Sequence, residues 1–310
     1  MISVVVPLYN KEKQIAHTLQ SVFNQTFQDF EIVIVDDGST DGSVAEVAKY
    51  SDSRIRLIRQ TNAGVSAARN RGIEEARYDL IAFLDADDEW KPEYLATQYY
   101  LSQKYPDCNV FACNYEFRDT EGKVTPTIIR KLPFTSDDGI LTNYFEVASC
   151  SHPPICSISI MVKKRAIQKI GGFPVGIKSG EDLLTWARLA VSGKIAYSKL
   201  ILSVFCESKS DTNKSKAQAR AGSEYIVLQS LFDLYKLESC YTIKKQLKQY
   251  ILRWYKIYAV IQIEIEKGHN ALKIAYKAIC FGGTLKEFFP IIILALLPNK
   301  ISRILFLKLR

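Results

Sequence analysis

The chain has 310 residues, of which 47% are hydrophobic and 24% charged, an ordinary composition for a globular protein of one large domain plus an appendage, or of two domains. The net charge of +8 is unevenly placed. Residues 211–310 contain 17 Lys and Arg against 7 Asp and Glu, whereas residues 1–210 contain 24 against 26. This asymmetry indicates an anionic partner for the last third. No run of about 18 apolar residues occurs, which excludes a membrane-spanning helix.

Strands and helices alternate through the first 90 residues. Continuous apolar runs predict strands at 2–7, 30–35, 55–58 and 80–84. Helical periodicity and small-residue spacing predict helices at 15–23, 43–50 and 64–76, the first of them capped by Asn10. This β-α-β-α-β-α-β order predicts a parallel sheet with right-handed crossovers.

The rest of the chain is less regular at first and then helical. Helices are expected at 92–105 and 181–191, a short helix near Gly171, and strands at 109–117, 157–162 and 195–205. The polar stretch 208–216 lacks periodicity and marks a domain boundary. Beyond it, helices are predicted at 217–237, 241–267, 269–281 and 284–297.

The seven cysteines form no CxxC pair and match neither a zinc site nor a disulfide framework. Reduced thiols used as core residues are therefore expected, which indicates a cytoplasmic protein. The start of the chain, Met1 to Pro7, has no basic stretch and no cleavage site, so a buried strand is expected there and not a secretory signal.

Polar clusters follow three of the predicted strands, at the edge where ligands of parallel sheets gather. They are Pro7-Leu8-Tyr9-Asn10, Asp36-Asp37-Gly38-Ser39 and Asp85-Ala86-Asp87-Asp88. An Asp-x-Asp sequence places two carboxylates on one side of an extended backbone, one for a divalent cation and one for a ribose hydroxyl. A diphosphate bridged by such a cation becomes a good leaving group. Taken singly, each acidic cluster also fits a helix cap, with Asp88 capping the helix expected near residue 91.

Four strings, in this order, resemble the inverting family-2 glycosyltransferases of the GT-A fold: VVVPLYNKEKQI, SVFNQTFQDFEIVIVDDGSTDGS, NAGVSAARNRGI and DLIAFLDADDEW. The resemblance is dense over about the first 100 residues. It implies an α/β GT-A domain with a Rossmann-like, mostly parallel sheet over residues 1–210. Residues 1–100 would be its nucleotide-binding half and 101–210 its acceptor-binding half, followed by an all-helical, basic C-terminal extension over 211–310.

The resemblance also implies roles for individual residues. The donor-binding set would be Pro7, Tyr9, Asp36, Asp37, Arg69, Asn70, Asp85 and Ala86. Within it, Pro7, Tyr9 and Asp37 would line the base pocket. Arg69 would reach the base or the diphosphate, with Asn70 beside it, and Asp85 would contact the ribose or the metal side.

The metal and catalytic residues follow in the same way. Asp87 would coordinate Mg²⁺ or Mn²⁺, with Asp88 a close alternative. A second motif, Glu181-Asp182 at a predicted helix start, resembles the family's catalytic site, with Asp182 as the general base that takes a proton from the acceptor hydroxyl. Acidic residues at a helix start also stabilise the helix dipole without any catalytic role.

The reaction implied is metal-dependent, inverting transfer of a single hexosyl group from a nucleotide-diphosphate sugar, UDP-linked, to an acceptor hydroxyl. The acceptor expected is a lipid-linked oligosaccharide in surface polysaccharide biosynthesis. The sequence Gln-x-x-Arg-Trp of processive relatives is missing, which favours addition of one sugar. The rival interpretation is a catalytically inactive, nucleotide-sugar-binding or membrane-associated scaffold.

Two interpretations stay open for residues 211–310. Lysines and arginines interleave there with aromatic residues, as in a helix that lies on an anionic membrane surface, which would place the protein peripherally on the inner face of the cytoplasmic membrane. Alternatively, these helices form a subdomain that packs on the catalytic domain. No nucleic-acid partner is expected, because no recognition module accompanies the basic charge.

Overall fold

A computed structural model describes residues 1–207 and 222–297. Contacts divide the chain into two units, Met1–Gly176 with Glu181–Lys209, and Ile177–Gly180 with Ser210–Arg310. The expected boundary at 208–216 lies outside the described residues, so the division at residue 210 stays a prediction.

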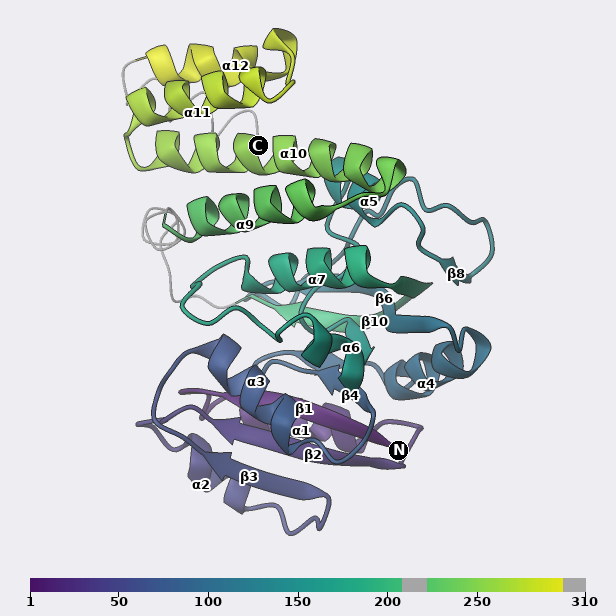
Figure 1. Ribbon diagram of the computed structural model, residues 1–310. Helices are drawn as coiled ribbons and strands as arrows, with labels where there is room; N and C mark the ends of the chain where they lie inside the picture. Colours follow the sequence, from purple (N-terminus) through teal and green to yellow (C-terminus); the bar gives the residue numbers. More distant parts are fainter. Residues whose placement is uncertain (208–221, 298–310) are drawn as a thin grey trace. The chain divides into compact units, whose positions relative to one another are not determined.

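A ten-stranded sheet forms the centre of the first unit (Figure 1). Its strands are β1 (Ile2–Leu8), β2 (Phe30–Asp36), β3 (Ile55–Arg59), β4 (Leu80–Phe83), β5 (Glu89–Trp90), β6 (Cys108–Arg118), β7 (Val124–Pro126), β8 (Asp138–Ile140), β9 (Ile160–Lys163) and β10 (Lys194–Cys206). The order is β3-β2-β1-β4-β9-β6-β10-β5, with β7 paired to β6 and β8 to β10. The prediction of an α/β sheet is confirmed.

The first four strands are parallel, with β1 between β2 and β4 and with β3 beside β2. Every residue of β1 and β2 is buried, as expected for strands covered on both faces. Beyond β4 the sheet is mixed, because β9 runs antiparallel to both β4 and β6, while β6 and β10 are parallel. The strands β5, β7 and β8 were not predicted, since two or three residues carry no readable periodicity.

Seven helices accompany the sheet within the described part of this unit. They are α1 (Ile15–Phe23), α2 (Ser43–Ala48), α3 (Val65–Glu75), α4 (Tyr94–Lys104), α5 (Tyr144–Cys150), α6 (Lys164–Lys169) and α7 (Glu181–Ser192). The small face of α3 lies on β1, where a Cβ added to Gly72 would be 2.2 Å from Val5 Cγ1. The predicted cap at Asn10 is wrong, because the residue at the N-cap of α1 is Gln14.

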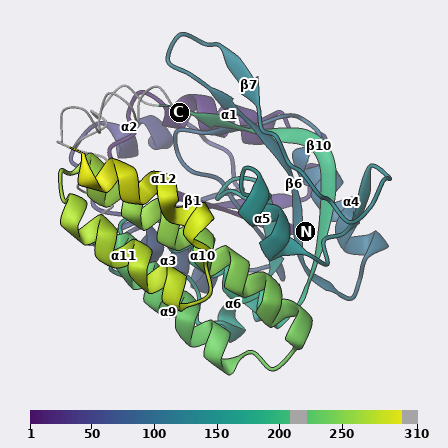
Figure 2. The same cartoon turned by 90° about the horizontal axis from the view of Figure 1, so that it is seen from above.

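The second unit contains α9 (Ser223–Leu237), α10 (Tyr241–Glu264), α11 (Gly268–Cys280) and α12 (Leu285–Leu296). Figures 1 and 2 show α10 beside α9 and α11, with α12 next to α11. These helices share a core that includes Leu231, Ile251 and Phe288, which are buried. The helical prediction is confirmed over the described residues. Of the helix expected at 217–237, residues 217–221 lie outside them.

Candidate active site

A cavity of about 470 Å³ opens where β1, β2 and β4 end, a volume within the range of small-molecule sites. The residues that line it follow these strand ends or lie in neighbouring loops. Among them are Pro7, Tyr9, Lys11, Asp37, Asn62, Gly64, Ala68, Asp85, Ala86, Asp87, Asp88, Phe205 and Cys206. All three polar clusters singled out in the sequence therefore contribute to one cavity.

The loop after β1 is fixed to the loop after β2. Asn10 adopts φ 51°, and its Oδ1 accepts a hydrogen bond from the Thr40 backbone N–H at 2.8 Å. The Lys11 backbone N–H donates to Ser43 Oγ at 2.8 Å. These bonds set the position of Tyr9, whose side chain remains 46% exposed.

Asp37 organises the wall opposite this loop. Its carboxylate is buried and accepts hydrogen bonds from Gln60 Nε2 at 2.7 Å and from the backbone N–H groups of Ala63 and Gly64 at 2.9 and 2.8 Å. Asp37 thus shapes the turn that begins α3, and its oxygens also border the cavity. Asp36 is fully buried, bonded to the Ser39 N–H and paired with Arg59 at 3.3 Å, and it is not among the residues that line the cavity.

Arg69 lies buried between two carboxylates. Its Nη2 donates to Asp85 Oδ1 at 2.7 Å, and its Nη1 donates to Glu181 Oε1 at 3.1 Å. Ser157 Oγ adds a hydrogen bond to Asp85 Oδ2 at 2.8 Å. A bridge therefore connects the end of β4 to the start of α7. Because the guanidinium serves this bridge, contact between Arg69 and the donor stays a prediction.

Three carboxylates crowd the end of β4. Asp87 Oδ2 is 2.5 Å from Lys11 Nζ. Asp88 is buried, and its Oδ1 accepts the Cys206 backbone N–H at 2.7 Å instead of capping a helix, so that part of the sequence interpretation is wrong. Burial raises the pKa of Asp88 well above its ordinary value, and the charges of Asp85 and Asp87 raise it further.

These oxygens fit a hard divalent cation. The crowding that raises the pKa of Asp88 is the kind of repulsion that a bound cation relieves. Among the described residues, no three His, Cys, Asp or Glu side chains form a metal-binding group. A cation held by Asp87 or Asp88 would therefore take its remaining ligands from donor phosphates and water, as Mg²⁺ commonly does.

Asp182 and Asn70 lie outside the cavity lining but close to its supports. Asp182 follows Glu181 at the start of α7, and its Oδ1 accepts the Leu183 N–H at 2.7 Å. Burial raises the pKa of Asp182 to about 7; the charge of Glu181 adds to the rise, and that of Arg69 opposes it. Asn70 clamps the Phe173 backbone through two hydrogen bonds of 2.8 Å.

Several cavity residues were missed from the sequence. Lys11 and Asn62 fall inside strings that had been singled out, so their place in the motif was the available signal. Phe205 and Cys206 come from the end of β10, and Ser157 precedes β9. These three depend on pairing between distant segments, for which a single sequence gives no signal.

The architecture is that of a GT-A glycosyltransferase. The chain is similar to TarS 1-349 of S. aureus, solved in complex with UDP-GlcNAc, with a TM-score of 0.71 at 19% identity, over 95% of this chain and 86% of that one. It is also similar to the mannosyltransferase PcManGT of Pyrobaculum calidifontis, solved with GDP-Man and Mn²⁺, with a TM-score of 0.61 at 19% identity, over 92% and 76%. Identities this low establish the fold alone.

Sequence comparison gives the family. Residues 3–169 match Glycosyl transferase family 2, and the chain belongs to that family. It is 44% identical to the uncharacterized glycosyltransferase YibD of Escherichia coli over 124 residues, 38% of this chain and 36% of YibD. It is 30% identical over 200 residues to TuaG of Bacillus subtilis, named for teichuronic acid biosynthesis, 64% of this chain and 75% of TuaG. The match thus spans only about a third of the length of YibD.

Proposed function

We propose that the protein transfers a single sugar from a nucleotide-diphosphate sugar to an acceptor hydroxyl, with inversion at the anomeric carbon. The donor proposed is a UDP-sugar. The observation that carries this proposal is the convergence of Asp37, Asp85 and Asp87 on one cavity, with Asp182 tied to Asp85 through Arg69 and Glu181. Membership of family 2 and the donors present in TarS and PcManGT support it.

In this proposal the cavity residues bind and orient the donor. The Tyr9 ring stacks on the base, and the backbone around Asp37 borders it. Asp87 and Asp88 would hold Mg²⁺ or Mn²⁺, which would neutralise charge on the diphosphate and so make it a better leaving group. Lys11, 2.5 Å from Asp87, then becomes available to the phosphate oxygens.

Asp182 is proposed as the general base. A carboxylate whose pKa lies near 7 is well matched to accepting a proton from a hydroxyl at neutral pH. The acceptor oxygen attacks the anomeric carbon as its proton passes to Asp182, and the bond to the diphosphate breaks on the opposite face. Glu181 and Arg69 act as positioning residues that hold the start of α7 against the end of β4.

The acceptor proposed is a lipid-linked surface glycan. The name of TuaG refers to teichuronic acid biosynthesis, which supports a glycan as the product of the reaction. Membrane contact is proposed for α12, because Leu285, Phe289 and Ile293 are 61%, 54% and 42% exposed along one face. By contrast, Tyr250, Trp254 and Tyr255 of α10 are 3%, 4% and 6% exposed, so these three aromatic residues do not form such a face. No helix of residues 1–207 and 222–297 has the length and apolar character needed to cross a bilayer.

The test is a donor screen on the full chain with UDP-, GDP- and dTDP-sugars, with and without Mn²⁺. Transfer from a UDP-sugar that requires the metal supports the proposal, and Asp182→Asn should keep donor binding while losing turnover. Asp233→Asn, on the exposed side of α9, serves as the matched control. Donor binding without turnover in the wild-type protein, and an unchanged cellular glycan in Asp182→Asn, would favour the scaffold interpretation.

A further inference from the structure

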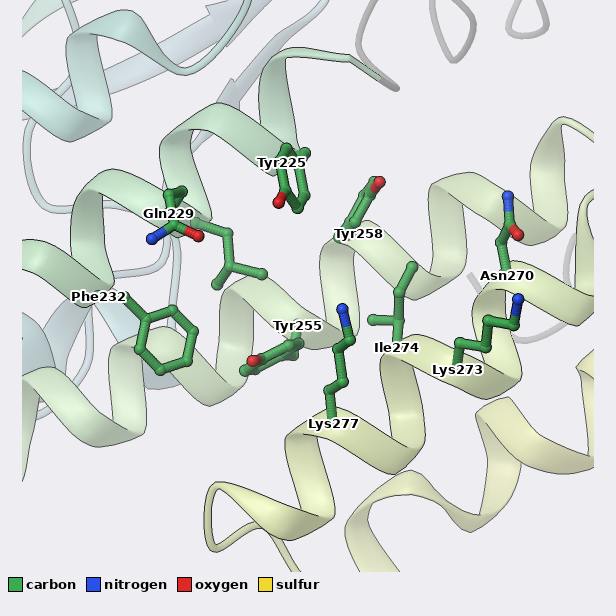
Figure 3. A pocket seen from close by; sticks show the side chains of 10 residues that line it. Tyr225, Gln229, Phe232, Tyr255, Tyr258, Asn270, Lys273, Ile274 and Lys277 are labelled. Carbon is green, nitrogen blue, oxygen red and sulfur yellow. The ribbon is translucent and has the colours of Figure 1, made fainter.

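A second cavity lies within the helical unit, between α9, α10 and α11 (Figure 3). Its volume is about 310 Å³, at the lower end of the range for small-molecule sites. Tyr225, Gln229 and Phe232 line it from α9 at a spacing of one turn, which places them on one face of that helix. The cavity is therefore bordered by repeated helix faces and is not a gap left by a single short side chain.

Aromatic rings make up much of its surface. Tyr255 of α10 is only 6% exposed and meets Phe232 edge-to-face, with ring centroids 5.7 Å apart. One turn further along α10, Tyr258 lies 6.4 Å from Tyr225, which is itself 54% exposed. A recessed ring beside an accessible one offers flat apolar surface with hydroxyl groups at its rim. That combination suits the C–H face and the hydroxyls of a sugar ring.

Two lysines add positive charge to this aromatic surface. Lys273 and Lys277 lie one turn apart on α11, and both are exposed. Neither forms an ion pair with an acidic residue of the described chain. By contrast, Lys236 on α9 pairs with Asp233, one turn before it on the same helix. In Figure 3 the Lys277 side chain points into the space bordered by Tyr255 and Tyr258. Two cations that no acidic side chain of residues 1–207 and 222–297 pairs with favour an anionic ligand.

The remaining polar groups are neutral. Gln229 and Asn270 place amide groups at the cavity, and Asn270 Nδ2 donates to Gln262 Oε1 at 3.3 Å. Amides both donate and accept hydrogen bonds, which suits hydroxyl groups more than a second charge. The acidic Glu224 is buried and does not line the cavity, although its charge contributes to the raised pKa of Tyr258, after burial and Tyr225.

We propose that this cavity binds a sugar residue that carries a carboxylate or a phosphate. The sugar ring packs on the accessible rings of Tyr225 and Tyr258, the acidic group meets Lys273 and Lys277, and the amides of Gln229 and Asn270 bind hydroxyls. A membrane surface is a poorer match, because Tyr255 in the cavity wall is only 6% exposed, whereas Leu285, Phe289 and Ile293 form a protruding apolar face on α12. The cavity is thus a glycan subsite within the helical unit.

The identity of that glycan as the acceptor rests on the proposed transferase function; the binding itself does not. A subsite here would hold one residue of an acidic acceptor chain while another residue of the chain enters the transfer site. Binding to this cavity would then raise acceptor affinity without altering the chemistry at Asp182. The effect should appear in KM for the acceptor and leave kcat unchanged.

The experiment measures binding to the full chain, without donor, by calorimetry. The probes are tetragalacturonate, its fully methyl-esterified and therefore neutral form, and glucose 6-phosphate beside glucose. We expect the acidic member of at least one pair to bind more tightly than its neutral partner, with binding that weakens as salt rises. Equal binding within both pairs, or none at all, would overturn the proposal.

Variants locate the binding. Lys277→Gln should weaken the acidic probe by about fivefold, the effect of losing one partly exposed ion pair, and Lys273→Gln together with it should weaken binding further. Lys286→Gln, at an exposed position of α12 outside the cavity, is the matched control and should bind as the wild type does. Unchanged binding in the double variant refutes the site.

Two further arms separate the remaining explanations. In the first, the protein is mixed with phosphatidylglycerol vesicles. If the wild type binds them, the double variant does not, and no sugar binds, the lysines belong to a lipid-binding surface and the glycan subsite is overturned. Asp182→Asn should bind tetragalacturonate normally. If no donor is ever turned over but the acidic sugar still binds through Lys273 and Lys277, the subsite stands and the transferase proposal fails.

Discussion

Turnover should depend on pH through the protonation of Asp182. Burial raises the pKa of this carboxyl to about 7, and only its ionised form can take a proton from the acceptor. Because the ionised fraction of Asp182 grows with pH, kcat should rise with pH and level off above the pKa. At pH 6 about one-tenth of the enzyme would carry the ionised base, so kcat should be about tenfold below its plateau.

The neighbours of Asp182 allow a sharper version of this test. The negative charge of Glu181 contributes to the raised pKa of Asp182, whereas Arg69 opposes the rise. Glu181→Gln should therefore move the midpoint of the kcat profile to lower pH. In Asp182→Asn, kcat should fall by about 10²-fold or more across the whole range.

The assay is transfer from a saturating donor between pH 5.5 and 9, with kcat and KM determined separately. Asp88 also has a raised pKa, but it lies in the donor cavity, so its protonation should change KM for the donor or the affinity for Mn²⁺. Asp233→Asn serves as the control and should reproduce the wild-type profile. A kcat that stays flat from pH 5.5 to 9, or wild-type turnover in Asp182→Asn, would refute the role of Asp182.

Three substitutions test the supports of the site. Arg69→Met removes the cation between the buried Glu181 and the partly buried Asp85 and should lower the free energy of unfolding by about 3–5 kcal/mol, measured in urea; no change would show that the bridge is dispensable. Lys11→Ala removes the partner of Asp87 and should tighten Mn²⁺ binding in the absence of donor, measured by calorimetry. Weaker binding would show that Lys11 and the cation do not compete for Asp87. Gly180 has φ 80°, and a Cβ added there would lie 2.9 Å from Trp254, so Gly180→Ala should displace the start of α7 and lower kcat. Wild-type turnover in this variant would show that the backbone at residue 180 does not position Asp182.

The sheet and the cavity at the ends of β1, β2 and β4 were largely predictable because their signals are local. Fully buried parallel strands appear as apolar runs, and each of the three runs that matter ends in a polar cluster that does line the cavity. The same locality explains the errors. The cap assigned to Asp88 was plausible one turn before a helix, yet its carboxylate bonds to Cys206, 118 residues away.

The supports of the site could not be predicted for the same reason. Arg69 and Glu181 are 112 residues apart, and their ion pair exists only once β4 and α7 are in place. A buried arginine in a small-residue helix has no distinguishing pattern in one sequence. The aromatic cavity of the helical unit was hidden in a different way, because Tyr255 and Tyr258 had been assigned to a membrane face and Lys273 and Lys277 carry no motif that singles them out.

The path of the chain through its two units affects how the protein can be dissected. Residues Ile177–Gly180 belong to the helical unit, where the Lys178 N–H donates to Ser223 Oγ at 3.1 Å, and the next residue opens α7. Truncation after residue 207 would therefore remove Ser223, which anchors the segment that leads into Glu181 and Asp182. A chimaera made with a relative should therefore exchange residues Ile177–Gly180 together with the C-terminal helices, so that the segment before α7 keeps its own partners in the helical unit.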